Sequence, residues 1–267
     1  MAVTTARQLT RLAVLAVLAC ALVYVVALGT RWGLKADARA LPGGTSGVTW
    51  ARAHAAASRA IHTIHVATIA LAGVAAALVA LRRGRRDLAA VALATLAGAN
   101  LTTFVLKPLL AHADPLGGEA LRRLDASFPS GHATAAMSLA LVAVMVAPRR
   151  WRPWVAVAAA VYAGTVGVAL VLRFDHFPSD VVGGYLVAGA WATAMAAIAL
   201  RHRGAPPVRM PSPGIVLTGA GFVLAAGALL LAPASHLDHG VFAVSAVVIA
   251  GLALLLPVAL TVMLSRS

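Results

Sequence analysis

Cysteine, acidic residues and charge of either sign are all scarce in this sequence. Cys20 is the only cysteine among 267 residues, which excludes an internal disulfide and a metal site built from thiolates. Charged residues make up only 11% of the chain, hydrophobic residues 61%, and the mean hydropathy is +0.90. This composition lies far from that of a soluble domain and indicates a membrane protein.

The few charges that are present are mostly positive. Lysine and arginine number 22 against 8 acidic residues, for a net charge of +14. In a soluble protein this excess would suggest a nucleic-acid partner. Here the basic residues form short clusters between long apolar runs, which is typical of membrane topology, so we expect no nucleic-acid binding.

Apolar segments long enough to cross a bilayer recur along the chain. A spanning helix needs about 20 predominantly apolar residues. The segments that approach this length are 9–29, 57–81, 88–111, 132–148, 154–172, 180–200, 213–233 and 240–263. The sequence therefore predicts an all-α fold, a polytopic membrane helical bundle of about eight transmembrane helices.

The charges of the connecting segments alternate along the chain. One set carries the basic clusters Arg7, Arg11, Arg82, Arg83, Arg85, Arg86, Arg149, Arg150, Arg152, Arg201, Arg203 and Arg209. The other set holds most of the acids, namely Asp37, Asp114, Glu119, Asp125, Asp175, Asp180 and Asp238. Since basic loops stay inside, we expect a multi-pass protein of the plasma membrane with both termini cytoplasmic and the acidic loops extracytoplasmic.

Prolines between the sixth and seventh segments suggest a boundary. Pro206, Pro207, Pro211 and Pro213 interrupt the chain there. We expect a six-helix core over residues 1–205 and two additional C-terminal transmembrane helices over 206–267. A stripe of small residues, Ala94, Gly98 and Thr102, suits helix packing within one chain or between two, so a homo-oligomer stays open.

Polar side chains near a membrane span are costly and therefore mark candidate sites. Lys107 lies near the outer end of the third segment, and Asn100 and Thr103 share its helix stripe. A lysine that only snorkels to the interface would explain Lys107 equally well. The lysine becomes informative only together with other polar groups on the same side.

A second group precedes the fourth segment. In Ser127-Phe128-Pro129-Ser130-Gly131-His132-Ala133-Thr134, proline and glycine shape a turn and His132 opens a helix. The free N–H groups of a helix start bind anions. The alternative is an ordinary helix cap at Ser130.

A third group leads into the sixth segment. It reads Arg173-Phe174-Asp175-His176-Phe177-Pro178-Ser179-Asp180. Asp180 follows His176 by four residues, so its carboxylate is able to hold one imidazole nitrogen and leave the other free to react. A polar turn capped by Ser179 is the alternative.

Taken together, the three groups resemble the signature motifs of the type 2 phosphatidic acid phosphatase superfamily. The motifs lie at 107–115, 129–132 and 170–180, and their order and spacing match the family. The resemblance implies a six-helix phosphatase core with the motifs at the outer ends of its third, fourth and sixth helices, as the charge pattern also places them.

The resemblance also implies roles for single residues. His176 would be the nucleophile that forms a phosphohistidine, Asp180 would orient it, and His132 would protonate the leaving oxygen. Lys107, Ser130 and the Gly131 amide would hold the phosphate. Phosphoryl transfer depends chiefly on positioning and positive charge, so no metal and no cofactor are expected.

Two arginines of the family pattern are missing from this chain. Asp114 stands where the first motif usually has arginine, and Leu170 stands six residues before His176 where the third motif usually has another. The available substitutes are Arg173, Arg122, Arg123 and His112, with Arg173 ranked first for its place three residues before His176. We therefore expect a phosphate site of unusual composition.

Two further histidine groups are weaker candidates. Arg59, His62 and His65 recur every three residues, which suits either a headgroup-binding stripe or snorkelling at the interface. His236 and His239 lack carboxylate or cysteine companions, so we expect no metal there.

The sequence thus predicts an integral membrane phosphatase that hydrolyses a lipid phosphate or diphosphate at the outer face, with the substrate and membrane lipids as its partners. The alternative is a membrane protein that binds or flips a lipid phosphate with little or no hydrolysis. Polyprenyl diphosphates, phosphatidic acid, phosphatidylglycerol phosphate and phosphorylated prenyl sugars all stay open as substrates.

Overall fold

The computed structural model describes residues 2–41, 48–110, 128–203 and 237–265. In these ranges the chain forms α-helices, one π-helical turn and no strand. The elements are α1 (Ala2–Val23), η1 (Tyr24–Leu28), α2 (Arg31–Arg39), α3 (Val48–Ile61), α4 (Val66–Arg82), α5 (Arg86–Leu109), α6 (Gly131–Val146), α7 (Arg152–Leu172), α8 (Pro178–Arg203) and α10 (Leu237–Ser265). The predicted all-α class is confirmed.

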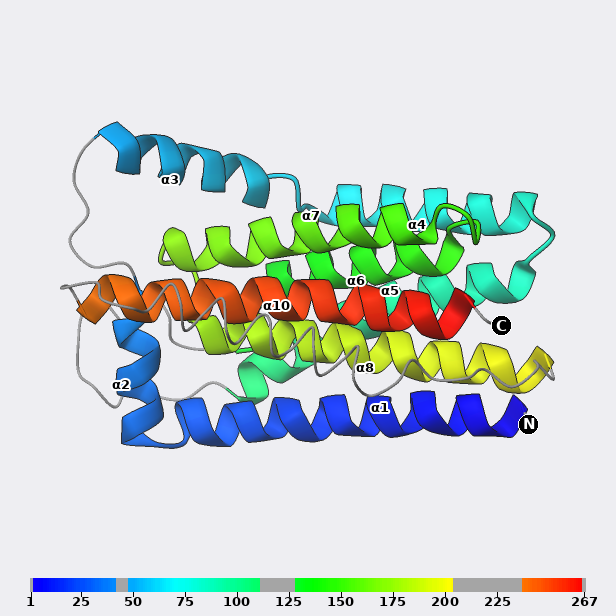
Figure 1. Ribbon diagram of the computed structural model, residues 1–267, viewed down its shortest axis with the longest axis horizontal. Helices are drawn as coiled ribbons and strands as arrows, with labels where there is room; N and C mark the ends of the chain where they lie inside the picture. Colours follow the sequence, from blue (N-terminus) through cyan, green and yellow to red (C-terminus); the bar gives the residue numbers. More distant parts are fainter. Residues whose placement is uncertain (1, 42–47, 111–127, 204–236, 266–267) are drawn as a thin grey trace.

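The long helices lie side by side, so that their ends define two ends of the bundle (Figure 1). The start of α1 and the end of α10 lie at one end, and the short helix α2 stands across the other. Helix α8 packs against α1, α5 and α6, while α10 lies mainly on α7. Most of α6 is buried, which places this helix at the centre of the core.

The helices have the length and composition of a multi-pass membrane protein. Among the residues that the structure describes, five helical segments are long and apolar enough to cross a bilayer: Ala6–Leu28, Arg86–Leu109, Arg152–Leu172, Pro178–Arg201 and Gly240–Leu264. The pair α3 and α4 would make a sixth span if it crosses as one unit. The predicted seventh segment, 213–233, lies outside the described residues.

The helix predicted over 57–81 is not continuous. It is divided into α3 and α4, which meet at an angle of 54°. Side-chain hydroxyls satisfy the backbone at the break: Thr63 Oγ1 donates to the Ala60 carbonyl, and Thr68 Oγ1 accepts from the His65 amide at 2.9 Å. Threonine side chains compete in this way with helical hydrogen bonds, and apolar periodicity does not reveal it.

Helix α6 is short for a spanning helix. Its 16 residues rise only about 24 Å, less than the hydrocarbon thickness of about 30 Å. Arginines hold its C-terminal end: Arg83 Nη1 donates to the Val146 carbonyl at 2.7 Å, and Arg152 Nε donates to the Ala147 carbonyl at 3.2 Å. Cations stabilise this end of a helix. If these arginines lie at the inner interface, the other end of α6 is recessed from the outer interface.

The C-terminal helix joins the same core. Ile249, Ala253, Leu260 and Met263 of α10 belong to the buried cluster that contains α6, α7 and α8. The small-residue stripe on α5 packs against α8 of the same chain. Gly98 lies against the Trp191 ring, and Trp191 Nε1 donates to Thr102 Oγ1 at 3.0 Å. Both observations describe packing within a single chain.

Candidate active site

The third motif occupies the turn between α7 and α8. Helix α7 ends at Leu172, and Phe174 adopts a left-handed conformation with φ of 60°. The amides of Asp175 and His176 both donate to the Leu170 carbonyl, at 3.0 and 3.4 Å. Residues other than glycine rarely adopt this backbone conformation, and strained turns of this kind are common at functional sites. The turn directs His176 toward the start of α8.

His176 and Asp180 form the pair that the sequence predicts. Asp180 Oδ2 lies 3.4 Å from His176 Nδ1 and accepts the Phe177 amide at 3.0 Å. His176 is 6% exposed and Asp180 is fully buried. The contact occupies Nδ1, so Nε2 is the imidazole nitrogen left for a substrate.

The second motif is joined to the third through the backbone. Ser130 caps α6, with its hydroxyl accepting the Ala133 amide at 3.3 Å, and the Ser130 amide donates to the Asp180 carbonyl at 2.9 Å. The close approach of Ser130 to α8 requires Gly184, where an added Cβ would lie 2.7 Å from the Ser130 carbonyl oxygen. This glycine therefore allows the starts of α6 and α8 to touch.

The first motif reaches the same place through a polar seam between α5 and α6. Asn100 Nδ2 donates to Ser138 Oγ at 3.3 Å, and the hydroxyls of Thr103 and Thr134 lie 2.9 Å apart. Lys107 is half-buried one helical turn beyond Thr103. The predicted stripe on α5 thus faces the helix that carries His132.

The charges of the three motifs act on one another. His132 is exposed at the start of α6 and interacts electrostatically with His176, Lys107, Asp175 and His65. With the hydrogen bond from the Ser130 amide to the Asp180 carbonyl, these interactions bring the three motifs together where α5 ends and α6 and α8 begin: Lys107, Ser130, Gly131, His132, His176 and Asp180. Their catalytic roles remain predictions.

Sequence reasoning missed Asp37, which lies on α2. Its carboxylate accepts the Ser179 amide on Oδ1 at 3.2 Å, and Ser179 Oγ donates to Oδ2. Burial, reinforced by the charge of Asp180, raises the pKa of Asp37 from 3.8 to about 7, even though the Ser179 hydrogen bonds oppose the shift. The sequence places this acidic residue in a predicted outer loop, but does not reveal its partner Ser179, which lies 142 residues away.

Of the substitutes proposed for the missing arginines, only Arg173 lies within the described residues. Arg173 Nε pairs with Asp175 at 3.0 Å, and its Nη1 donates to Ser58 Oγ at 2.7 Å. Leu170, in the place of the second family arginine, is fully buried in the core cluster. Arg122 and Arg123 lie outside the described residues, as do His112 and Asp114.

The weaker candidates do not form a single helical stripe. Arg59 lies in the last turn of α3, whereas His62 and His65 lie at the break before α4, and all three are exposed. His236 lies outside the described ranges, and the side chain of His239 is not described. Over residues 2–41, 48–110, 128–203 and 237–265, no group of three or more histidine, cysteine or acidic side chains is placed to hold a metal ion.

Apolar grooves run along the outside of the bundle. One of about 340 Å³ lies between α1, α5 and α8, and its lining includes Cys20, Ala21, Leu106, Leu110 and Phe128. It continues into a groove of about 660 Å³ between α1 and α8, since both share Val17, Ala190 and Trp191. We call the two together the α1/α5/α8 groove. It begins beside the first and second motifs.

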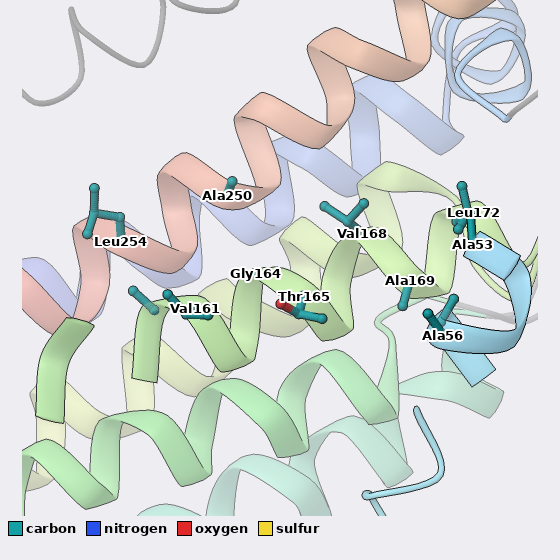
Figure 2. Close-up of a pocket in the computed structure, with 12 residues that line it drawn as sticks. Ala53, Ala56, Val161, Gly164, Thr165, Val168, Ala169, Leu172, Ala250 and Leu254 are labelled. Atoms are coloured by element: carbon teal, nitrogen blue, oxygen red, sulfur yellow. The ribbon is translucent and has the colours of Figure 1, made fainter. Parts of the chain in front are cut away.

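A separate groove of about 600 Å³ lies between α3, α7 and α10 (Figure 2). Ala53 and Ala56 line it from α3, Gly164 and Val168 from α7, and Ala250 from α10. We call it the α3/α7/α10 groove. Its lining contains no residue of the first or second motif.

Comparison with known families gives one match. The PAP2 superfamily model matches residues 88–203, a stretch that contains α5 to α8 and all three motifs. Comparison with curated proteins and with solved structures gave no match. The three motifs, the helices that carry them and the match to the PAP2 superfamily therefore agree over residues 88–203.

Proposed function

We propose that the protein is an integral membrane phosphatase that hydrolyses a lipid phosphate or diphosphate through a phosphohistidine intermediate. The observation that carries the proposal is the buried His176–Asp180 pair, which the Ser130 amide ties to the start of α6 at one end of a membrane bundle. The family match supports hydrolysis of a phosphate ester. The lipid substrate and the intermediate are our inference.

His176 performs the first step. Its Nε2 attacks the phosphorus while Asp180, at Nδ1, holds the ring and stabilises the positive charge that develops on it. An N–P bond forms as the ester P–O bond breaks. The departing oxygen takes a proton from His132, which acts as the general acid.

The second step releases phosphate. His132, now neutral, accepts a proton from a water molecule, and the water oxygen attacks the phosphorus of the phosphohistidine. The N–P bond breaks, and inorganic phosphate leaves. The exposed position of His132 at the helix start gives it access to both the leaving group and water.

Positive and hydrogen-bonding groups surround the phosphate in this proposal. Lys107 supplies a cation, and Ser130 and the Gly131 amide supply donors at the start of α6, where the helix dipole also favours an anion. Arg173 is a further candidate cation, with Nη1 bonded to Ser58 and Nε paired with Asp175. Arg122 and Arg123 are the further candidates in place of the missing motif arginines.

The position of the site fits a substrate that stays in the bilayer. With its C-terminal end at the inner interface, the short helix α6 would leave the second motif recessed just inside the outer interface, within reach of the phosphate of a lipid that stays in the bilayer. Phe128, two residues before Ser130, and Leu106, next to Lys107, both line the α1/α5/α8 groove. We propose that the lipid tail lies in this groove, with the site on the extracytoplasmic side of the plasma membrane and both termini in the cytoplasm.

A substrate panel tests the function directly. Purified protein in detergent or vesicles should release inorganic phosphate from long-chain lipid phosphates or diphosphates, and more slowly from a short soluble phosphate ester. Saturable binding of lipid phosphate with no release would favour the binding or flipping alternative and contradict the proposal.

A further inference from the structure

Asp37 and Ser179 form a contact between α2 and the catalytic turn that the three motifs do not include. Asp37 is 8% exposed and Ser179 is 7% exposed, so both partners are shielded from water. Both carboxylate oxygens of Asp37 accept hydrogen bonds from Ser179, one from its amide and one from its hydroxyl. Ser179 stands directly before Asp180 in the first turn of α8.

Helix α2 is built to hold Asp37 in this place. Thr30 caps the helix by accepting the Gly33 amide at 2.9 Å, and its hydroxyl donates to the Val26 carbonyl at 2.7 Å. At Gly33 an added Cβ would lie 2.1 Å from the Val26 carbonyl oxygen, so α2 packs directly on η1. Asp37 follows Gly33 by four residues, on the same buried face.

The same helix also shares an apolar cluster with the segment just before the second motif. Leu34 is buried in a small cluster with Leu28 and Phe128, and Phe128 precedes Pro129 and Ser130. The Phe128 ring in turn packs on Gly183 of α8, where an added Cβ would lie 2.4 Å from a ring carbon. Helix α2 is therefore linked to the turn before α6 through this cluster and to the turn before α8 through Asp37.

We propose that Asp37 is a positioning residue of the active site: its two hydrogen bonds to Ser179 fix the first turn of α8, and thereby set Asp180 against His176. This inference rests on the proposed function, because it concerns the nucleophile named there. Asp37 does not touch the substrate. It acts through Ser179 and Asp180.

Hydrogen bonding, and not charge, carries this role. Because burial raises the pKa of Asp37 to about 7, its carboxyl takes up a proton near neutral pH. A protonated carboxyl still accepts the Ser179 amide on one oxygen and donates to the Ser179 hydroxyl from the other. An asparagine has the same shape and the same pattern of one acceptor and one donor.

The experiment compares Asp37→Ala with Asp37→Asn in the full-length protein. Phosphate release from a long-chain lipid phosphate is measured per folded molecule, with folding checked by gel filtration and thermal midpoint. We expect Asp37→Ala to lower kcat roughly tenfold to a hundredfold with KM within about twofold, because small displacements of reacting groups are costly. Asp37→Asn should keep kcat within about threefold of wild type.

Ser179→Ala and Lys35→Ala complete the set. If Asp37 acts through Ser179, the double variant Asp37→Ala/Ser179→Ala should be no slower than Asp37→Ala alone. Lys35 is exposed on the same helix, so Lys35→Ala should match wild type.

Three results would overturn the inference: unchanged kcat in folded Asp37→Ala, loss in Asp37→Asn equal to that in Asp37→Ala, or additive losses in the double variant. Lack of phosphate release by the wild-type protein would instead contradict the proposed function, and the two failures are therefore distinguishable.

Discussion

The third motif and the first motif lie at the same end of the bundle but are held very differently. Contacts from several elements fix the third: Asp37 of α2 holds Ser179, the Ser130 amide holds the Asp180 carbonyl, and the end of α7 holds the His176 amide. Lys107 of the first motif is half-buried at the end of α5, close to the apolar groove. The proposed nucleophile is preorganised, whereas the proposed phosphate-binding lysine is more open.

Because the two motifs are held differently, we expect the third motif to affect the chemical step and the first motif to affect substrate binding. Groups that orient the nucleophile should affect the rate of phosphorus attack, since an aligned reactant lowers the barrier. Groups that face the open side should affect how the lipid phosphate is captured as well as how its charge is stabilised. Substitutions in the two motifs are therefore expected to change different kinetic constants.

The largest effect is expected at Asp180. Asp180→Ala removes the partner of His176 Nδ1 and should lower kcat by about 10³ to 10⁴, as loss of a carboxylate that orients a catalytic histidine does elsewhere. Steady-state phosphate release measures it. Asp87→Ala is the control, because that carboxylate pairs with Arg85 at the start of α5, at the opposite end of this helix from Lys107. A comparable loss in both variants would contradict the special position of Asp180.

A smaller effect is expected at Lys107. Lys107→Ala removes one cation from the phosphate site and should lower kcat/KM by about 10 to 100, with a clear rise in KM. Lys107→Arg keeps the charge and should recover part of the loss. The comparison between motifs would be wrong if Lys107→Ala lowered kcat alone and left KM unchanged.

The grooves offer a matched pair of substitutions. Ala21 and Ala250 are exposed alanines that line the α1/α5/α8 and α3/α7/α10 grooves. Ala21→Phe should lower kcat/KM for a long-chain lipid phosphate about tenfold by filling the space for the tail, and leave hydrolysis of a short soluble ester unchanged. Ala250→Phe should leave both substrates unaffected. The reverse pattern would assign the tail to the α3/α7/α10 groove shown in Figure 2.

The raised pKa of Asp37 predicts a smaller effect, a dependence of protein stability on pH. Because burial raises its pKa to about 7, the folded protein binds this proton more tightly than the unfolded chain. The resulting stability is complete below about pH 4 and is lost as pH rises through about 7. Between pH 5 and 8 the thermal midpoint of wild type should fall more than that of Asp37→Asn. Parallel curves for the two proteins would contradict the raised pKa.

The polar end of the bundle was largely predictable from local signals. Charge alternation and apolar length placed Lys107, His132 and His176 on one side, and the spacing of four residues between His176 and Asp180 predicted their contact. These features depend on neighbours within one helix or on the general cost of polar groups in a bilayer.

What the sequence did not reveal depends on contacts between distant segments. Asp37 belongs to a short polar helix without spanning character, and its contact with Ser179 links elements far apart in the chain. Gly184 looks like any helical glycine until Ser130 is placed against it. The break between α3 and α4 depends on threonine hydroxyls that bond to the backbone, which hydropathy does not record.

Trapping the intermediate tests the central claim most directly. Protein mixed with a lipid phosphate that carries ³²P in the phosphate group is quenched within one turnover, and the label bound to protein is counted after alkaline and after acid treatment. The account predicts a label that survives alkali and is lost in acid, as expected for a phosphohistidine, and its absence in His176→Ala. Wild-type phosphate release by His176→Ala, or an equal label in that variant, would contradict it.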